Sequence, residues 1–146
     1  MKASVKQIVD AYNALGNAKS STLDDAEKAK ILKARKVMRP FVTEYEAFEK
    51  DCQEMHKYEG LEKDAELYNS ALNKYYQGKG NEVTEEEAKA HERVMEYDRK
   101  IKKSLHEEEV KEVELEFEKL SEGSDVKLMS ANDWTPKQLD MIDVIL

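Results

Sequence analysis

A regular spacing of apolar residues between Ile31 and Met55 is the strongest pattern in the chain. The apolar positions recur at alternating intervals of three and four residues, which places them along one edge of an α-helix. They are Ile31, Ala34, Met38, Phe41, Tyr45, Phe48, Cys52 and Met55. The pattern predicts one long helix over about 24–58, whose apolar edge must be covered by another helix.

Pro40 lies inside this predicted helix. Proline removes one backbone hydrogen bond and costs about 3 kcal/mol in a helix interior. The apolar spacing keeps its phase on both sides of Pro40. One kinked helix is therefore favoured over two separate helices, and Gly60 is expected to follow its end.

Three capping-box pairs predict the starts of further helices. In such a pair, the side chains of a Ser or Thr and of a Gln or Glu three residues later satisfy free backbone N–H groups at the helix start. The pairs are Ser4 with Gln7, Thr84 with Glu87, and Thr135 with Gln138. They predict helices over about 4–16 and 84–106 and a short terminal helix from Pro136, while apolar spacing predicts another over about 61–77.

After His106 the apolar period changes from that of a helix to that of a strand. Apolar and acidic residues alternate strictly in the run Val113, Glu114, Leu115, Glu116, Phe117, Glu118. This alternation is typical of a half-buried strand. A turn at 122–125 and a return strand through Val126 and Leu128 would complete a hairpin. The alternative is that the preceding helix continues to Leu120, and the strand is favoured slightly.

Together these elements predict a mainly α fold. We expect a helical bundle with one long kinked helix, a coiled-coil-like hairpin and a small C-terminal β or extended element. The length of 146 residues fits a single domain, 1–146. Within it, residues 107–146 form a possible C-terminal β or extended segment followed by the terminal helix.

Charge is distributed unevenly along the predicted helices. Six basic residues and no acidic ones lie between Lys28 and Arg39, and residues 44–54 of the same helix are mainly acidic. The helix over 84–106 has the opposite polarity, so parallel placement of the two helices would match unlike charges at both ends. An antiparallel homodimer through the long helix would match its ends in the same way.

Composition and hydropathy indicate which partners and which cellular compartment to expect. Charged residues make up 38% of the chain and its net charge is −8, which disfavours binding to nucleic acid and to anionic membranes. No apolar run approaches the roughly 18 residues that span a bilayer, and the N-terminus lacks the apolar core of a signal peptide. A single cysteine, Cys52, cannot form an internal disulfide. A cytoplasmic protein is expected.

No motif for catalysis, metal binding or cofactor binding stands out, so we expect neither an enzyme nor a cofactor. His56, His91 and His106 have no metal-ligand spacing with one another or with Cys52. One alternative is a small ligand-binding or enzymatic domain with a site built from Glu87, His91 and Tyr97. Another is a nucleic-acid-binding regulator that uses Lys28–Arg39, although no aromatic residue interleaves that run.

The leading hypothesis is a non-catalytic protein–protein interaction or assembly protein that self-associates. The candidate interaction surface combines the middle of the long helix with the apolar C-terminal tail. Its residues are Met38, Phe41, Tyr45, Phe48, Trp134, Leu139, Ile142 and Ile145. For the tail, two interpretations remain open: it binds a groove on a partner, or it closes the protein's own core.

Four segments resemble a family of small, uncharacterised phage and prophage helical proteins. They are VKQIVDAYNAL (5–15), RPFVTEYEAFEKDCQEMHKYEG (39–60), EVKEVELEFEKL (109–120) and WTPKQLDMIDVIL (134–146). The resemblance implies a phage or prophage origin and the cytoplasm of a bacterial host. It implies no catalytic residues and no mechanism.

Overall fold

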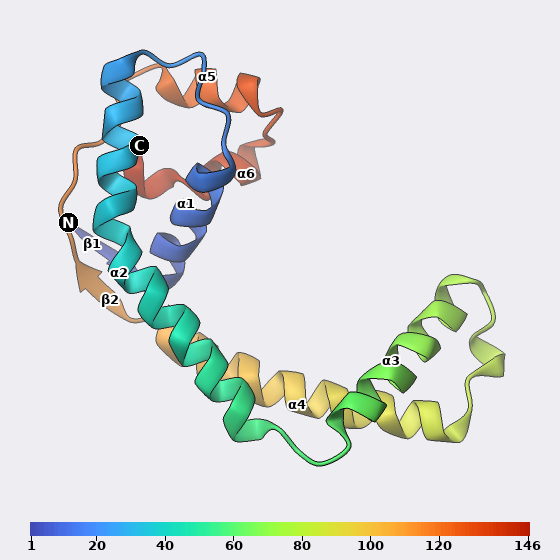
Figure 1. Ribbon diagram of the computed structural model, residues 1–146. Helices are drawn as coiled ribbons and strands as arrows, with labels where there is room; N and C mark the ends of the chain where they lie inside the picture. Colours follow the sequence, from blue (N-terminus) through green and yellow to red (C-terminus); the bar gives the residue numbers. More distant parts are fainter. The chain divides into compact units, whose positions relative to one another are not determined.

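The computed structural model describes all 146 residues and is mainly α-helical, with six α-helices and one two-stranded antiparallel sheet (Figure 1). The sequence predicts a single domain, whereas contacts within the chain separate it into two compact units. Unit 1 contains Met1–Ala47 and Glu107–Leu146, and unit 2 contains Phe48–His106.

Unit 1 brings the two ends of the chain together. Its elements are β1 (Lys2–Ser4), α1 (Val5–Asn17), the first part of α2 (Asp25–His56), the end of α4 (Glu85–Glu109), β2 (Glu112–Glu114), α5 (Ser124–Ala131), α6 (Pro136–Asp140) and the short 3₁₀ helix η2 (Asp143–Ile145). The predicted capping boxes at the starts of α1 and α6 are both present. Each capping box lies within four consecutive residues, so the starts of these two helices could be predicted from the local sequence.

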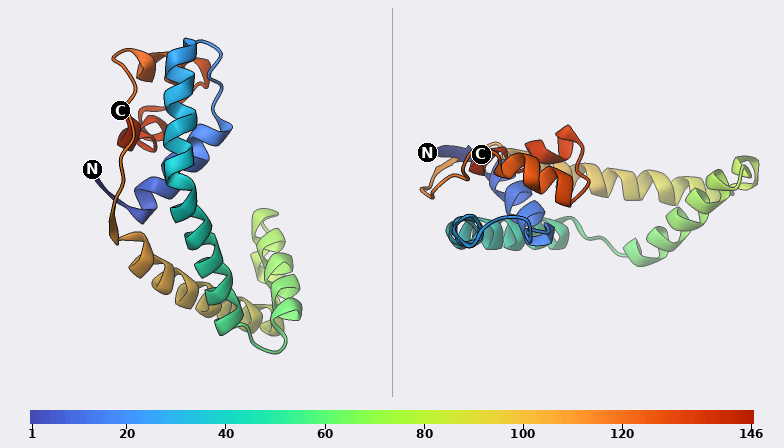
Figure 2. Two further views of the ribbon diagram at one scale, coloured as in Figure 1. Left: turned by 60° about the vertical axis from the view of Figure 1, so that its left-hand side comes forward. Right: turned by 90° about the horizontal axis from the view of Figure 1, so that it is seen from above.

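The apolar edge of α2 forms the centre of the unit 1 core. Ile31, Ala34, Met38 and Val42 on α2 are buried in one cluster with residues from α1 and from the C-terminal segments. These further members include Ile8, Ala11, Leu15, Leu128, Ile142 and Ile145. Figure 2 shows α1, α5 and α6 beside the first part of α2. From Ile31 to Val42 the predicted need for a cover is therefore met within the same chain, whereas Met55 at the end of the predicted edge is exposed.

The C-terminal tail closes this core. Ile142 and Ile145 are completely buried, and the backbone N–H of Leu120 donates to the carbonyl of Ile145 at 2.8 Å. Of the two interpretations of the tail, the structure supports the terminal helix that packs on its own domain. The alternative, in which the tail is free to bind a partner's groove, is wrong for these two residues.

A strand is present after His106, but it covers only Glu112–Glu114 instead of the predicted run to Glu118, and its partner differs from the prediction. β2 pairs antiparallel with β1, with Ala3 opposite Val113. The predicted return strand is wrong, because Val126 and Leu128 lie on α5, which begins after Gly123 with φ 91°. Leu128 is buried and Val126 exposed, since residues two apart on a helix face different directions. The alternative helix to Leu120 is also wrong, because α4 ends at Glu109.

α2 continues through Pro40, so the preference for one helix over two is confirmed. The ring of Pro40 leaves the carbonyl of Lys36 without its helical donor. Both residues are exposed on the same side of α2. Water can therefore satisfy that carbonyl, and the apolar edge opposite is left intact.

Glu27 is a buried carboxylate that ties α2 to the segment before α5. Its side chain accepts hydrogen bonds from the N–H of Ser121 at 2.6 Å and from the hydroxyl of Ser124 at 2.7 Å. Lys30 forms an ion pair with it at 2.9 Å. The hydrogen bond from Lys30, with help from Ser124, lowers the pKa of Glu27 to about 2. Residues more than 90 positions apart are thereby held together.

Unit 2 consists of the end of α2, α3 (Leu61–Tyr76), the short 3₁₀ helix η1 (Gly80–Glu82) and most of α4. The predicted capping box of Thr84 and Glu87 is present at the start of α4. The buried apolar side chains of unit 2 are mostly small: Cys52, Ala71, Ala90, Ile101 and Leu105. The apolar core of this unit is correspondingly thin.

The predicted parallel placement of α2 and α4 is wrong where the two helices meet. In unit 2 the hydroxyl of Tyr97 lies 3.4 Å from the carbonyl of Gln53. In unit 1 the hydroxyl of Tyr45 donates to Glu109 at 2.7 Å. Residue numbers therefore rise along α2 as they fall along α4, and the contacting segments are antiparallel. The short connection through α3 and the packing of apolar side chains outweigh weak charge pairing between exposed groups.

Replacement of Ile145 tests the role of the tail in the core. Ile145→Ala removes a fully buried side chain and should destabilise unit 1 by about 2–5 kcal/mol. Met141→Ala is the matched control, because Met141 is 46% exposed and should cost less than about 1 kcal/mol. Urea unfolding can be followed by the fluorescence of Trp134, the only tryptophan, which packs against this core. Equal effects of the two replacements would show that the tail is not part of the core.

Candidate functional site

The structure places most of the predicted interaction residues in the protein's own core. Met38, Ile142 and Ile145 are completely buried in unit 1. Phe41, Trp134 and Leu139 are half-buried against the same core, and Tyr45 is half-buried beside Glu109. Phe48 is half-buried in unit 2. Met38, Ile142 and Ile145 are therefore not accessible to a partner in this fold, because apolar spacing shows which residues face inward but not what covers them.

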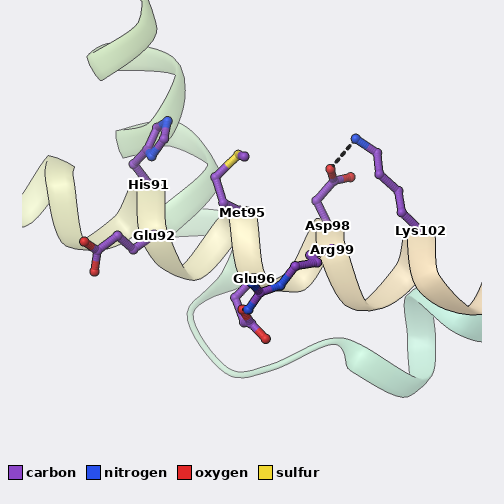
Figure 3. Close-up of a pocket in the computed structure, with 7 residues that line it drawn as sticks. All are labelled: His91, Glu92, Met95, Glu96, Asp98, Arg99 and Lys102. Carbon is purple, nitrogen blue, oxygen red and sulfur yellow. Dashed lines mark ion pairs between the residues drawn. The ribbon is translucent and has the colours of Figure 1, made fainter.

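A hollow on α4 in unit 2 is a better candidate site. It has a volume of about 530 Å³ (Figure 3). All its lining residues come from α4: His91, Glu92, Met95, Glu96, Asp98, Arg99 and Lys102. We call this set the α4 face. The apolar spacing of the sequence does not reveal this set of residues, because Met95 lies outside the run of buried positions on α4. Met95 is recognised only by its exposure in the folded chain.

The α4 face has an apolar centre and a charged border. His91, Met95, Asp98 and Lys102 follow one another at intervals of four, three and four residues, and Figure 3 shows their side chains on the same side of the helix. Met95 is 48% exposed. Asp98 and Lys102 form an ion pair at 2.7 Å beside it. This arrangement leaves a thioether open to contact, surrounded by polar groups.

Tyr68 of α3 orders two side chains of the α4 face. Its ring is stacked on that of His91, with centroids 4.9 Å apart and planes 19° from parallel. Its hydroxyl lies 3.9 Å from the sulfur of Met95, within reach of a weak hydrogen bond. The conformations of His91 and Met95 are therefore partly set before any contact with another molecule.

The ion pair of Asp64 and Arg93 fixes α3 on α4. The guanidinium of Arg93 donates two hydrogen bonds to the buried carboxylate of Asp64, at 2.7 and 2.9 Å, a geometry typical of strong charge-assisted pairs. The hydroxyl of Tyr58 donates a third at 2.9 Å. The hydrogen bonds from Arg93 are the main reason that the pKa of Asp64 falls to about 2. Burial, and then the bond to Asp64, raise the pKa of Tyr58.

Glu87 is a second buried carboxylate that joins the same two helices. It forms an ion pair with Lys74 of α3, and it completes the capping box with Thr84. The hydrogen bond from Lys74 is the main cause of its lowered pKa, about 2. Glu87 is therefore an ionised structural group at neutral pH.

The structure does not bring together the three residues proposed for an enzymatic site. Glu87 is engaged by Lys74, and His91 is stacked on Tyr68. Tyr97 instead contacts Tyr58 edge-to-face, with centroids 6.2 Å apart, in a separate hollow. No group of three or more His, Cys, Asp or Glu residues is arranged to hold a metal ion. The enzymatic alternative thus has no assembled site on these residues.

Half of the basic run proposed for nucleic-acid binding is engaged inside unit 1. Lys30 is paired with Glu27, and the guanidinium of Arg35 lies 4.2 Å from the ring centroid of Tyr12. The Nε of Arg39 donates to the hydroxyl of Tyr12 at 3.4 Å. The run therefore does not present six free cations to a phosphate backbone.

Comparisons with known proteins add no identity to this picture. No protein-family model, curated protein or solved structure matches the chain. The resemblance to phage and prophage proteins accordingly stays a prediction. None of the helices has the length and apolar content required to cross a membrane.

Replacement of Arg93 tests the ion pair that positions α3. Arg93→Met should raise the pKa of Asp64 from about 2 toward its ordinary value of 3.8, because the main stabiliser of the carboxylate is lost. In the wild-type protein a carboxylate with a lowered folded-state pKa contributes stability above pH 3.8, and this contribution is lost as the pH falls through 2. Carboxyl ¹³C NMR titration measures the shift directly. An unchanged pKa in the variant would show that Arg93 is not its cause.

Proposed function

We propose that the protein is a non-catalytic binding module that contacts another protein chain through the α4 face. The observation that carries this proposal is the exposed Met95 at the centre of an ordered, charge-bordered surface. Protein interfaces typically combine an apolar centre, in which Met is enriched, with a polar rim. A flexible thioether also adapts its shape to a partner at low cost.

The rigidity of the surroundings supports binding at this surface. Tyr68 holds His91 and Met95, and the bidentate pair of Asp64 and Arg93 keeps α3 on α4. Side chains ordered before association lose less conformational freedom when a partner arrives. The α4 face is therefore suited to recognition by a protein surface without refolding of unit 2.

Besides Met95, unit 2 exposes three further large apolar side chains. Met55, Tyr75 and Tyr76 are exposed, Tyr76 to 85%, while the buried set of this unit is mostly small residues. Contiguous exposed apolar patches are typical of surfaces that bind partners, whereas single exposed side chains are common on any protein. The resemblance to small phage and prophage proteins implies that such a partner would be met in a bacterial cytoplasm.

Site-specific photo-crosslinking tests the proposal. A photoreactive amino acid in place of Met95 should give light-dependent adducts with a protein chain in a bacterial lysate, because the partner lies within contact distance. The same amino acid in place of Val126, which is 66% exposed but lies in unit 1, is the matched control and should give several-fold fewer adducts. Adducts at position 95 with a different protein should decrease when unlabelled wild-type protein is added, because the wild type competes for that partner.

The role of Tyr68 provides a second arm of this experiment. Tyr68→Ala removes the stacking partner of His91 and should reduce the adducts at position 95. Equal yields at positions 95 and 126, or no adducts at either, would contradict the proposal.

A further inference from the structure

Exposed charged residues along one side of α4, in and beyond the α4 face, include acidic ones near its start and basic ones toward its end. Glu85 and Glu92 are exposed near the start of α4, and Arg99 and Lys103 are exposed toward its end. On a helix with 3.6 residues per turn these four side chains lie within about one quarter of its circumference, next to the stripe of Met95. Lys89 pairs with Glu85, and Glu96 pairs with Arg99, on the same helix. Glu92 and Lys103 are therefore the two members of this set without an ion pair within α4, and they are of opposite charge.

Glu92 and Arg99 are placed almost symmetrically about Met95. They are seven residues apart, so about 10 Å separates them along the helix axis, with Met95 near the midpoint. Glu92 has no ion-pair partner in its own chain, and Arg99 pairs only with the exposed Glu96 one turn away. Exposed pairs of this kind are weak and readily exchanged. Glu92 is thus free to face another molecule, and Arg99 can do so by exchanging Glu96 for another carboxylate.

If a second α4 helix lies antiparallel against the first, residues of opposite charge face each other at two equivalent places. With a two-fold axis near Met95, Glu92 of each copy lies opposite Arg99 of the other. Met95 of each copy then packs beside its equivalent, which covers the exposed apolar centre. A parallel arrangement would place like charges opposite each other and is disfavoured.

We propose that the partner of the α4 face is a second copy of this chain, bound antiparallel across a two-fold axis at Met95. The inference rests on the proposed binding function and specifies its partner. The stripe from His91 to Lys102 is only about 17 Å long, well below the extent of a standard interface. The dimer should therefore be weak, with a dissociation constant in the micromolar range or above. Because its charge pairs are exposed, added salt should weaken it further.

Charge reversal tests this pairing by sedimentation velocity of the full chain at low ionic strength. Glu92→Arg and Arg99→Glu should each weaken self-association by about tenfold or more, because each places two pairs of like charges across the axis. A mixture of the two variants should associate again, since one chain is then basic at both positions and its partner is acidic at both. Both residues are exposed, so circular dichroism should show an unchanged fold.

Lys33→Glu is the matched control for net charge. Lys33 is exposed in unit 1, and its reversal changes the net charge by the same amount as Arg99→Glu. Self-association of this variant should equal that of the wild type. Failure of the mixture to recover association, or an equal loss in Lys33→Glu, would overturn the inference.

The inference and the proposed function can fail separately. A wild-type chain that stays monomeric at all accessible concentrations overturns the inference. If Met95 then still crosslinks to a different protein, the proposed function stands with another partner. A monomer without adducts at Met95 overturns both.

Discussion

The apolar edge of α2 is the constraint on which the structure depends. A helix of 32 residues with one continuous apolar edge cannot remain exposed, because burial of that edge supplies most of the free energy that offsets the ordering of the chain. In unit 1 the cover comes from α1 and from the C-terminal segments, which converge on Ile31 to Val42. The two ends of the chain meet because both contribute to the same cover.

The remaining features of unit 1 follow from this convergence. Once the two ends of the chain lie together, Lys2–Ser4 can pair with Glu112–Glu114. The predicted C-terminal hairpin did not include this pairing. Glu27 then has Ser121 and Ser124 within hydrogen-bonding distance. A buried carboxylate is tolerated only when such donors surround it. The polar contacts thus fix which segments cover α2, while apolar burial drives the covering itself.

Unit 2 depends less on apolar burial and more on buried ion pairs than unit 1 does. Its buried apolar side chains are few and small, and two buried carboxylates with basic partners, Asp64 with Arg93 and Glu87 with Lys74, join α3 to α4. Polar pairs specify geometry without requiring a large core. The cost is that larger apolar side chains such as Met95 and Tyr76 remain exposed. The proposed binding function is assigned to unit 2 because Met95 is exposed there beside side chains that Tyr68 orders.

Local signals in the sequence predicted five of the six helices, all except α5, and long-range contacts limited the rest. The three capping boxes are present because each involves residues only three apart. The pairing of β2 with β1, and the burial of Met38 and Ile145 in one core, depend on residues about 110 positions apart, which no local pattern encodes. The α4 face was missed for a related reason. Met95 becomes noteworthy only because nothing in the folded chain covers it.

Amide hydrogen exchange along α2 tests the central claim most directly. If the protein's own ends cover the apolar edge, the amides between Ile31 and Val42 should be strongly protected, and their protection should not change with protein concentration. Rapid exchange over this stretch would show that the edge is not covered. Protection that appears only as the concentration rises would show that another molecule, and not the same chain, covers it.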